Sequence, residues 1–453
     1  MKRLLKRLAR GCCLFGCLPV VLLIVTFELV FLVPLKLEER GLAQDVAALR
    51  AQGIPTQWAD LVRPALPPEQ NAASYFLKAA ELLPSGESLY RATVQQQLYH
   101  ALLDSGKVDS VALSKGRKLV EAQRELLNLV EQGAKCPSAV YPLEWEDGAG
   151  TQFWHLGKVR SLAEFLALYV MVEAAGGKPE EAAHALELNF ALARSFRHEP
   201  ARSSQWAAAS VSEHTAHWLE AILRLKPPSQ QTAVRLFDRL GQLDLFTALA
   251  DGLDADYVYT LWLFDSVKLG KSQYWNVCIM KGFWYPDPPD WLTIPLTGPR
   301  AFTFTAWVLT RDERYQLAWL RQHQLGLRQG ATIPSQRLLI LRKCELWPWY
   351  GYLSSASVIE AQHELLYFER AQTRLSTARC GLAIVAFQQK TGKDPTSLDE
   401  VEKTLGWTLP LDPGTGKVFK LVREGKLLQV ESVLTENAGE GKTQPISFSV
   451  PGV

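Results

Sequence analysis

Residues 158–197 read KVRSLAEFLALYVMVEAAGGKPEEAAHALELNFALARSFR and contain two helix patterns separated by a short break. In the first pattern, apolar side chains recur at the i, i+3, i+4 and i+7 spacing of one helix face. They are Leu162, Phe165, Leu166, Tyr169 and Val172. Residues 176–179, Gly-Gly-Lys-Pro, put glycine after one helix and proline in the first turn of the next. A second stripe follows at Ala183, Leu186, Phe190 and Ala193. Because the connection is so short, the stretch predicts two antiparallel helices that pack together.

The sequence around this hairpin favours a mainly α fold of stacked antiparallel helical hairpins. A further helix is expected at residues 203–224, and residues 71–250 are predicted to form one helical domain. The spacing Gly177-x4-Ala182-x3-Leu186 resembles one tetratricopeptide-type hairpin. No repeat with a period of about 34 residues is found, so a regular array of such hairpins is not expected.

The N-terminal segment predicts a membrane anchor. A basic tail, residues 1–11, precedes an apolar run at residues 12–33 that is long enough to cross a hydrocarbon core of roughly 30 Å. The run is too long for a cleaved signal peptide and lacks small residues at its end. Since basic residues stay on the cytoplasmic side, we expect a single-pass protein of the cytoplasmic (inner) membrane, with its N-terminus inside and its bulk outside. Residues 34–70 are predicted to be a juxtamembrane helix, to about residue 50, and a proline-rich linker.

Composition limits the classes of partner. Apolar residues make up 47% of the 453-residue chain and charged residues 21%, which is typical of a folded protein rather than a disordered one. The net charge is only +2, and the basic tail alone contributes more than this. The rest of the chain is therefore slightly acidic, and we expect no nucleic-acid partner.

Four cysteines lie beyond the predicted anchor. They are Cys136, Cys278, Cys344 and Cys380. They are widely spaced and form no C-x-x-C pair, so a metal site is not expected. In an oxidising compartment they are disulfide candidates with the pairing left open, and buried free thiols are an equally good interpretation.

Residues 251–356 form an aromatic-rich region that contains eight of the fourteen tryptophans. Within it, residues 283–291, FWYPDPPDW, are too rich in proline for a helix or a central strand. If exposed, Trp284, Tyr285 and Trp291 would form a stacking platform for sugars, or a contact site for a partner or the membrane surface. If buried, the same loop would be a lid packed over the helices.

Residues 357–453 are predicted to be a long helix followed by a small antiparallel β-sheet. The helix should end near residue 391, and Ser397 with Glu400 three residues later is a capping-box pattern for a short helix. Alternating stretches predict three strands, at residues 418–423, 427–433 and 446–450.

These C-terminal residues carry a family resemblance. The run Phe387-x4-Gly392-x2-Pro395-x2-Leu398-x2-Val401, then Leu411-Asp412-Pro413-x2-Gly416-Lys417-x-Phe419, resembles a motif of uncharacterised bacterial membrane-anchored helical proteins. The motif is also similar to the C-terminal part of type II secretion pseudopilins, in which a long helix meets a small sheet. Asp394 departs from the usual tyrosine. The resemblance implies a shape, but no activity and no catalytic residue. Glu28 lies near the far end of the apolar run, which argues against the processing site of a pilin.

Two hypotheses for function follow from the sequence. The first is a membrane-anchored interaction or scaffold protein of the cell envelope, with a possible protein partner there, no cofactor and no evident catalysis. The second is a periplasmic protein that binds or cleaves glycans through its tryptophan-rich region. Asp251, Asp254 and Asp256 would then supply carboxylates or a loose calcium site, although their spacing selects neither.

Overall fold

The computed structural model describes the backbone of residues 2–84, 93–94, 96–98, 109–268, 303–328, 352–437 and 443–453. Within the helices, side chains are outside this description at residues 2–21, 24, 27, 28, 267, 303–305, 308 and 352–363. The protein is mainly helical, with a small antiparallel sheet at its C-terminal end, which confirms this part of the predicted fold.

The chain divides into two compact units. Unit 1 comprises Met1–Asp60, Asp256–Gln322 and Leu341–Ala361, and unit 2 comprises Leu61–Ala255, His323–Ile340 and Gln362–Val453. Unit 1 contains most of three long helices: α1 (Lys2–Ala51), α11 (Asp254–Lys268) and α14 (Thr303–Arg328). Among the described residues of unit 2, the α-helices before α11 are α2 (Ala72–Glu81), α4 (Ser110–Glu121), α5 (Arg124–Lys135), α6 (Trp154–Ala175), α7 (Pro179–Arg194), α8 (Arg202–Leu225), α9 (Gln230–Gly241) and α10 (Leu245–Gly252).

Helix α1 contains both the predicted anchor and the predicted juxtamembrane helix. No helix in the described part of the chain is both long enough and apolar enough to span a membrane. The anchor predicted at residues 12–33 falls largely on side chains outside the description. Between residues 22 and 37, the apolar side chains that are described are mostly exposed. The large exposed ones are Leu22, Leu23, Val25, Leu29, Val30, Leu32, Val33 and Leu37.

Ion pairs orient the helices of unit 1. Arg314 on α14 donates from Nε to Asp45 and from Nη1 to Glu38, both at 2.7 Å. These two carboxylates are seven residues apart and therefore share one face of α1. Their hydrogen bonds raise the pKa of Arg314, with Asp45 the larger cause. At the end of α11, Lys268 pairs in the same way with Glu313 on α14.

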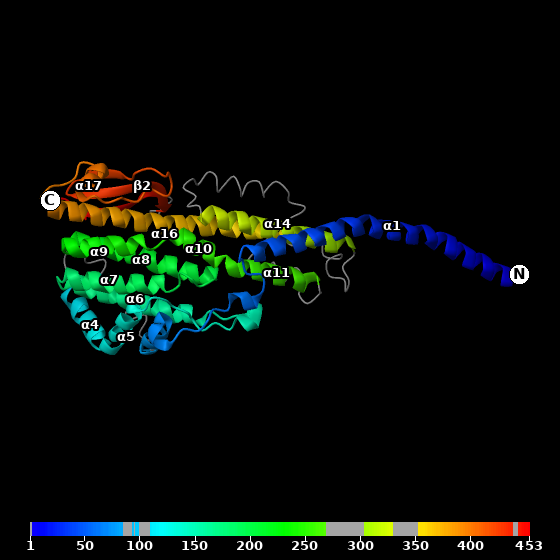
Figure 1. Ribbon diagram of the computed structural model, residues 1–453, viewed down its shortest axis with the longest axis horizontal. Coiled ribbons are helices and arrows are strands. Elements are labelled where there is room, and N and C mark those ends of the chain that lie inside the picture. The colour runs from blue at the N-terminus through cyan, green and yellow to red at the C-terminus, as the bar shows by residue number, and fades with distance from the viewer. Residues whose placement is uncertain are drawn as a thin grey trace. The chain divides into compact units, whose positions relative to one another are not determined.

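The helices of unit 2 are stacked in layers (Figure 1), with α6 packed against α7 and α7 against α8. The predicted break is observed: α6 ends at Ala175, Gly177 adopts a positive φ of 75°, and α7 begins with Pro179. Helix α6 is buried on more faces than the predicted stripe, because α2 and α4 also pack against it. Leu168 and Met171, which lie outside that stripe, are fully buried.

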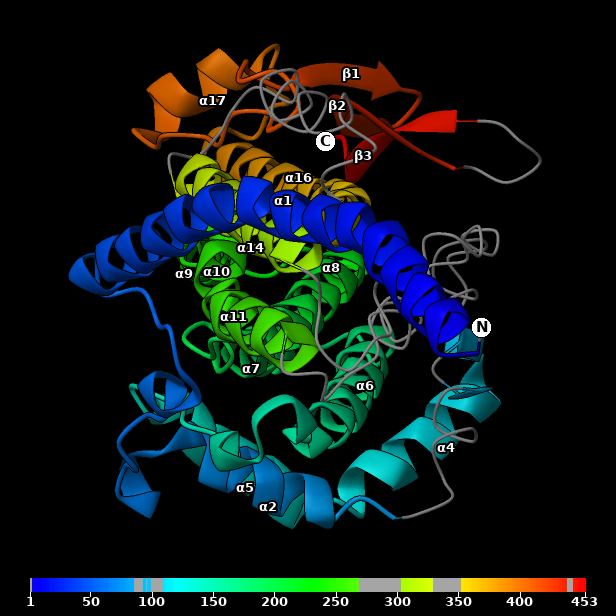
Figure 2. The same cartoon turned by 90° about the vertical axis from the view of Figure 1, so that its right-hand side faces the viewer.

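Small residues let α2 approach α5 closely, and Figure 2 shows these helices side by side. Gly133 of α5 faces Phe76 of α2, and a Cβ at Gly133 would lie 2.6 Å from the Phe76 ring. Phe76 is fully buried in a cluster with side chains of α5, α6, α7 and α8. This cluster is the part of the core that positions the site described below.

The C-terminal part consists of α16 (Tyr352–Thr391), α17 (Leu398–Leu405) and a sheet of β1 (Lys420–Glu424), β2 (Leu427–Asn437) and β3 (Thr443–Pro451). The strands are antiparallel, as predicted, and lie in the order β1-β2-β3 (Figure 2). Glu424 pairs with Leu427 across a two-residue turn in which Gly425 has a positive φ of 58°. The sheet packs closely on α16, since a Cβ at Gly381 would overlap the ring of Phe448.

Candidate functional site

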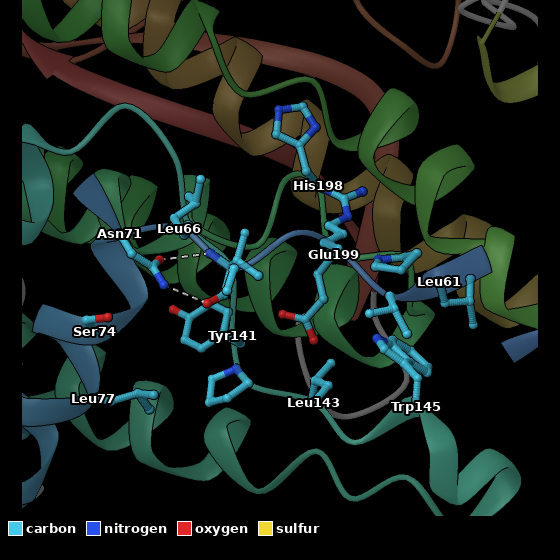
Figure 3. A pocket seen from close by; sticks show the side chains of 17 residues that line it. Leu61, Leu66, Asn71, Ser74, Leu77, Tyr141, Leu143, Trp145, His198 and Glu199 are labelled. Atoms are coloured by element: carbon cyan, nitrogen blue, oxygen red, sulfur yellow. Dashed lines mark hydrogen bonds between the residues drawn. The ribbon is translucent and has the colours of Figure 1, made fainter. Parts of the chain in front are cut away.

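A cavity of about 270 Å³ lies in unit 2, beside the start of α2 (Figure 3). Four segments and the side chain of Trp145 line it: residues 61–66, Asn71 with the first half of α2, the extended segment 139–143, and residues 198–200. Most lining side chains are apolar, among them Leu61, Leu66, Leu77, Leu143 and Trp145. The carboxylate of Glu199 lies between Tyr141 and Trp145 in this view. The cavity is therefore apolar with a few polar groups.

Asn71 builds one wall by joining α2 to the extended segment. Its Oδ1 accepts from Ala73 N–H at 3.1 Å, which caps α2, and also from Val140 N–H at 2.9 Å. Its Nδ2 donates to the carbonyl of Val140 at 2.9 Å. One side chain thus caps a helix and pairs with both backbone groups of Val140, as a neighbouring strand would. Ala72 N–H donates to the Ser138 carbonyl and extends this pairing.

Only some backbone amides of residues 139–143 are hydrogen-bonded. The amide of Val140 donates to Asn71, but the amides of Ala139, Tyr141 and Leu143 have no hydrogen-bond partner among the described residues. An extended segment pairs through alternate residues, so these amides belong to the positions that a neighbouring strand would occupy. The segment therefore has unused donors beside an apolar cavity.

A buried polar network holds Glu199 in place. Both carboxylate oxygens contact Nε2 of the fully buried His155, at 3.0 and 3.1 Å, and Ser204 Oγ donates to Oε1 at 2.6 Å. Because the carboxylate accepts, Nε2 carries the hydrogen. Gln205 Nε2 donates to the carbonyls of Phe196 and Glu199, both at 2.8 Å, and fixes the turn between α7 and α8.

Tyr141 is held from two sides. Its ring stacks on His155 and on Phe196, with centroid distances of 4.5 and 5.2 Å. Ser195 Oγ donates to the Leu192 carbonyl, so the Tyr141 hydroxyl donates to Ser195 at 2.7 Å. Burial raises the pKa of Tyr141, which keeps the phenol neutral. Its role here is to shape the cavity.

The network holds the Glu199 carboxylate at the wall of the cavity. Ser204 Oγ and His155 Nε2 both donate to it, and both of these side chains are fully buried. A carboxylate has about four acceptor positions, so Glu199 can accept a further donor from a ligand.

Charged groups surround the residues at 198–200. Burial lowers the pKa of Arg63, while the carboxylates of Asp251, Asp254 and Glu199 act in the opposite direction. Burial, Arg63 and Arg197 lower the pKa of His198, so its imidazole is neutral at pH 7. Burial also raises the pKa of Asp254 to about 6.

The aspartates singled out in the sequence have ordinary partners. Asp251 pairs with Arg328 at 3.3 Å, and Asp254 accepts from Gln324 Nε2 at 2.9 Å. Asp256 belongs to unit 1. No cluster of histidine, cysteine and acidic side chains that suits a metal ion is found in the described part of the chain.

The residues of the glycan hypothesis, Trp284, Tyr285 and Trp291, lie outside the described residues, so that hypothesis stays a prediction. The disulfide candidates Cys278 and Cys344 also lie outside them. Cys136 and Cys380 are free cysteines. The Cys136 thiol donates weakly to the carbonyls of Gln132 and Glu69, at 3.5 and 3.6 Å. Burial raises the pKa of both thiols, which makes them poor nucleophiles.

The motif residues of the C-terminal part hold the fold together. Buried Asp412 accepts from Gly414 N–H at 2.9 Å, from Ser432 Oγ at 2.9 and 3.0 Å, and from Val433 N–H at 3.1 Å. It thereby ties the turn at residues 412–416 to β2, where the pairing with β3 is irregular. The conformation of this turn, and not a ligand, accounts for the aspartate.

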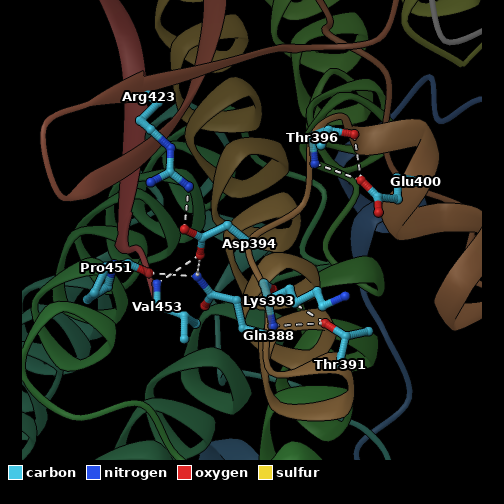
Figure 4. A network of polar contacts seen from close by, with 9 residues as sticks. All are labelled: Gln388, Thr391, Lys393, Asp394, Thr396, Glu400, Arg423, Pro451 and Val453. Atoms are coloured by element: carbon cyan, nitrogen blue, oxygen red, sulfur yellow. Dashed lines mark hydrogen bonds and ion pairs between the residues drawn. The ribbon is translucent and has the colours of Figure 1, made fainter.

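Asp394, which stands where the motif has tyrosine, joins α16 to β1 and to the residues that follow β3 (Figure 4). It accepts from Gln388 Nε2 at 2.9 Å, from Val453 N–H at 2.8 Å and from Arg423. Burial raises the pKa of Asp394, but these hydrogen bonds outweigh it and lower the pKa overall. Nearby, Ser397 caps α17, while Glu400 accepts from Thr396 instead of from Ser397 as in a capping box.

The cavity was not predicted from the sequence, although parts of it carried signals. Asn71 directly before an alanine-rich helix is a typical N-cap. Nothing local connects it to Tyr141 or Glu199. No protein-family model, no curated protein and no solved structure matches the chain.

Proposed function

We propose that this chain is a membrane-anchored interaction protein that holds an extended peptide segment of a protein partner in the cavity beside residues 139–143. The observation that carries the proposal is the combination of an apolar cavity with unpaired backbone amides on one of its walls. A peptide that pairs with those amides places alternate side chains on one face, and one of them enters the cavity.

The size of the cavity favours a side chain over a larger ligand. Pockets for drug-sized molecules and cofactors measure about 300–1,000 Å³. At about 270 Å³, this cavity is below that range and suits one large apolar side chain with its adjoining backbone. Backbone pairing would supply affinity and the apolar pocket would supply specificity. Glu199 would accept an N–H of the bound segment.

The anchor belongs to the same proposal. Exposed apolar side chains gather between residues 22 and 37 of α1, and large exposed apolar patches mark contacts with lipid or with another protein. The basic tail would lie in the cytoplasm. Unit 2 would then meet its partner in the cell envelope, outside the cytoplasmic membrane.

Site-directed photocrosslinking in cells tests the proposal. A benzophenone amino acid replaces Leu66, which lines the cavity, in the full-length chain. The matched control carries it at Leu325, an exposed leucine of α14 that does not line the cavity. We expect one discrete crosslinked peptide from position 66, absent from position 325 and displaced by a synthetic peptide of the same sequence.

Three results would overturn the proposal. They are equal crosslinking from both positions, a crosslinked product with the mass of a carbohydrate, and no product from position 66. Asn71→Ala, which releases residue 140, should reduce the crosslinking yield at position 66 when that yield is divided by the amount of protein in the membrane.

A further inference from the structure

A second cavity, of about 260 Å³, lies in unit 2 where residues of α5, α7 and α9 come together. Its walls come from α5, α7, α9 and the two residues after α9. The proposed peptide site uses none of these residues. The second cavity is therefore lined by a separate set of side chains.

The acidic side chains of this cavity already have partners. Glu131 pairs with His184 at 3.4 Å, and Glu187 pairs with Arg235. The remaining cations of the lining have no such partner. Lys135, Arg194 and Arg239 pair with no carboxylate among the described residues. With three basic side chains, Lys135, Arg194 and Arg239, against the two acidic ones, Glu131 and Glu187, the lining carries an excess of positive charge.

The positive charges of Arg194 and Arg239 both contribute to the electrostatic potential at this cavity. Burial lowers the pKa of Arg194, and the positive charges of Arg239 and Arg197 lower it further. Arg194 Nη1 donates to Gln242 Oε1 at 3.3 Å, which orients the guanidinium without neutralising it. Two uncompensated guanidinium groups at one cavity favour an anion, because each presents a planar fork of donors to carboxylate or phosphate oxygens.

The rest of the cavity is apolar. Leu188 and Phe190 are each only 3% exposed, and Ala134, Ala191 and Leu243 complete the wall. The volume is slightly below the range of about 300–1,000 Å³ for drug-sized ligands, so the body of the ligand is small. One aromatic ring or a short branched chain fits this requirement.

We propose that the cavity between α5, α7 and α9 binds a small organic anion. The carboxylate or phosphate group lies between Arg194 and Arg239, and the apolar body lies over Leu188 and Phe190. The peptide site can fail its own test while this one passes, because the two cavities share no residue.

Titration calorimetry on the full-length protein tests the proposal with probes of matched shape. Benzoate and phenyl phosphate carry an anionic group on one ring, benzylamine carries a cation on the same ring, and inorganic phosphate lacks the ring. We expect at least one of the aromatic anions to bind, benzylamine not to bind, and inorganic phosphate to bind at least tenfold more weakly than the better anion. Affinity should fall as salt is raised.

The substitution Arg239→Ala should weaken the better anion at least tenfold, and the fold should be kept because this side chain is exposed. The matched control is Arg160→Ala, an exposed arginine of α6 whose side chain is 81% accessible and which should leave binding unchanged. If only phenyl phosphate binds, the ligand class is phosphate esters. If both anions bind, the class is organic anions in general. Failure of both anions to bind, equal binding of benzylamine, or equal loss in the control would overturn the proposal.

Discussion

Replacing Asn71 by alanine removes the cap of α2 and the attachment of the 139–143 segment in a single change. Loss of an N-cap costs about 1 kcal/mol. Each of the two hydrogen bonds to Val140 adds about 1 kcal/mol. The free energy of unfolding should therefore fall by about 3 kcal/mol, because the bonds to Ala73 and to both backbone groups of Val140 are lost together.

Two matched variants separate the cap from the attachment. Asp109 caps α4 through Val111 and Ala112 but holds no other segment, so Asp109→Ala should cost only about 1 kcal/mol. Asn71→Asp keeps both accepted hydrogen bonds, but it puts a carboxylate oxygen against the Val140 carbonyl in place of the donor, so it should cost more than the roughly 1 kcal/mol of one hydrogen bond. Urea unfolding of the full-length chain, followed by tryptophan fluorescence, gives the three values. An Asn71→Ala loss equal to that of Asp109→Ala would refute the reasoning.

Three further substitutions test the electrostatics and the packing of unit 2. Because burial raises the pKa of Asp254 to about 6 from 3.8, its charged form opposes folding, and this penalty disappears as the pH falls through that range. Asp254→Asn should raise the free energy of unfolding by about 3 kcal/mol at pH 7.5 and by about 1.5 kcal/mol at pH 5, and equal gains in urea titrations would contradict this. Gly381→Ala should cost about 1–3 kcal/mol because the new methyl group overlaps Phe448. Gly157→Ala, on an open face of α6, should instead stabilise by about 0.5–1 kcal/mol, and a similar effect of the two changes on thermal unfolding would count against the packing argument.

The predictions that the structure confirms depend on short-range signals. Gly177 and Pro179 end one helix and begin the next within three residues. In such cases the contacts that determine the local structure are made between residues close together in the sequence. The alternation that predicts β1, β2 and β3 is equally local, and their positions agree within a few residues.

The cavity could not be found in this way, because its parts are distant in sequence. Asn71 and Val140 are 69 residues apart, and His155 and Glu199 are 44 apart. Each residue has an ordinary local interpretation, as an N-cap, a loop residue or a buried polar side chain. The role of Asp412 was equally out of reach from the sequence. The motif singles out this residue, but its role is seen only in the hydrogen bonds from Ser432 and Val433.

Hydrogen exchange at the amides of Tyr141 and Leu143 tests peptide binding most directly. In the free protein these amides have no partner among the described residues and should exchange fast, whereas that of Val140 is bonded to Asn71 and should exchange more slowly. When the peptide recovered by crosslinking is added, the amides of Tyr141 and Leu143 should become protected. A peptide that binds while both amides continue to exchange at their free rate would contradict the proposed pairing.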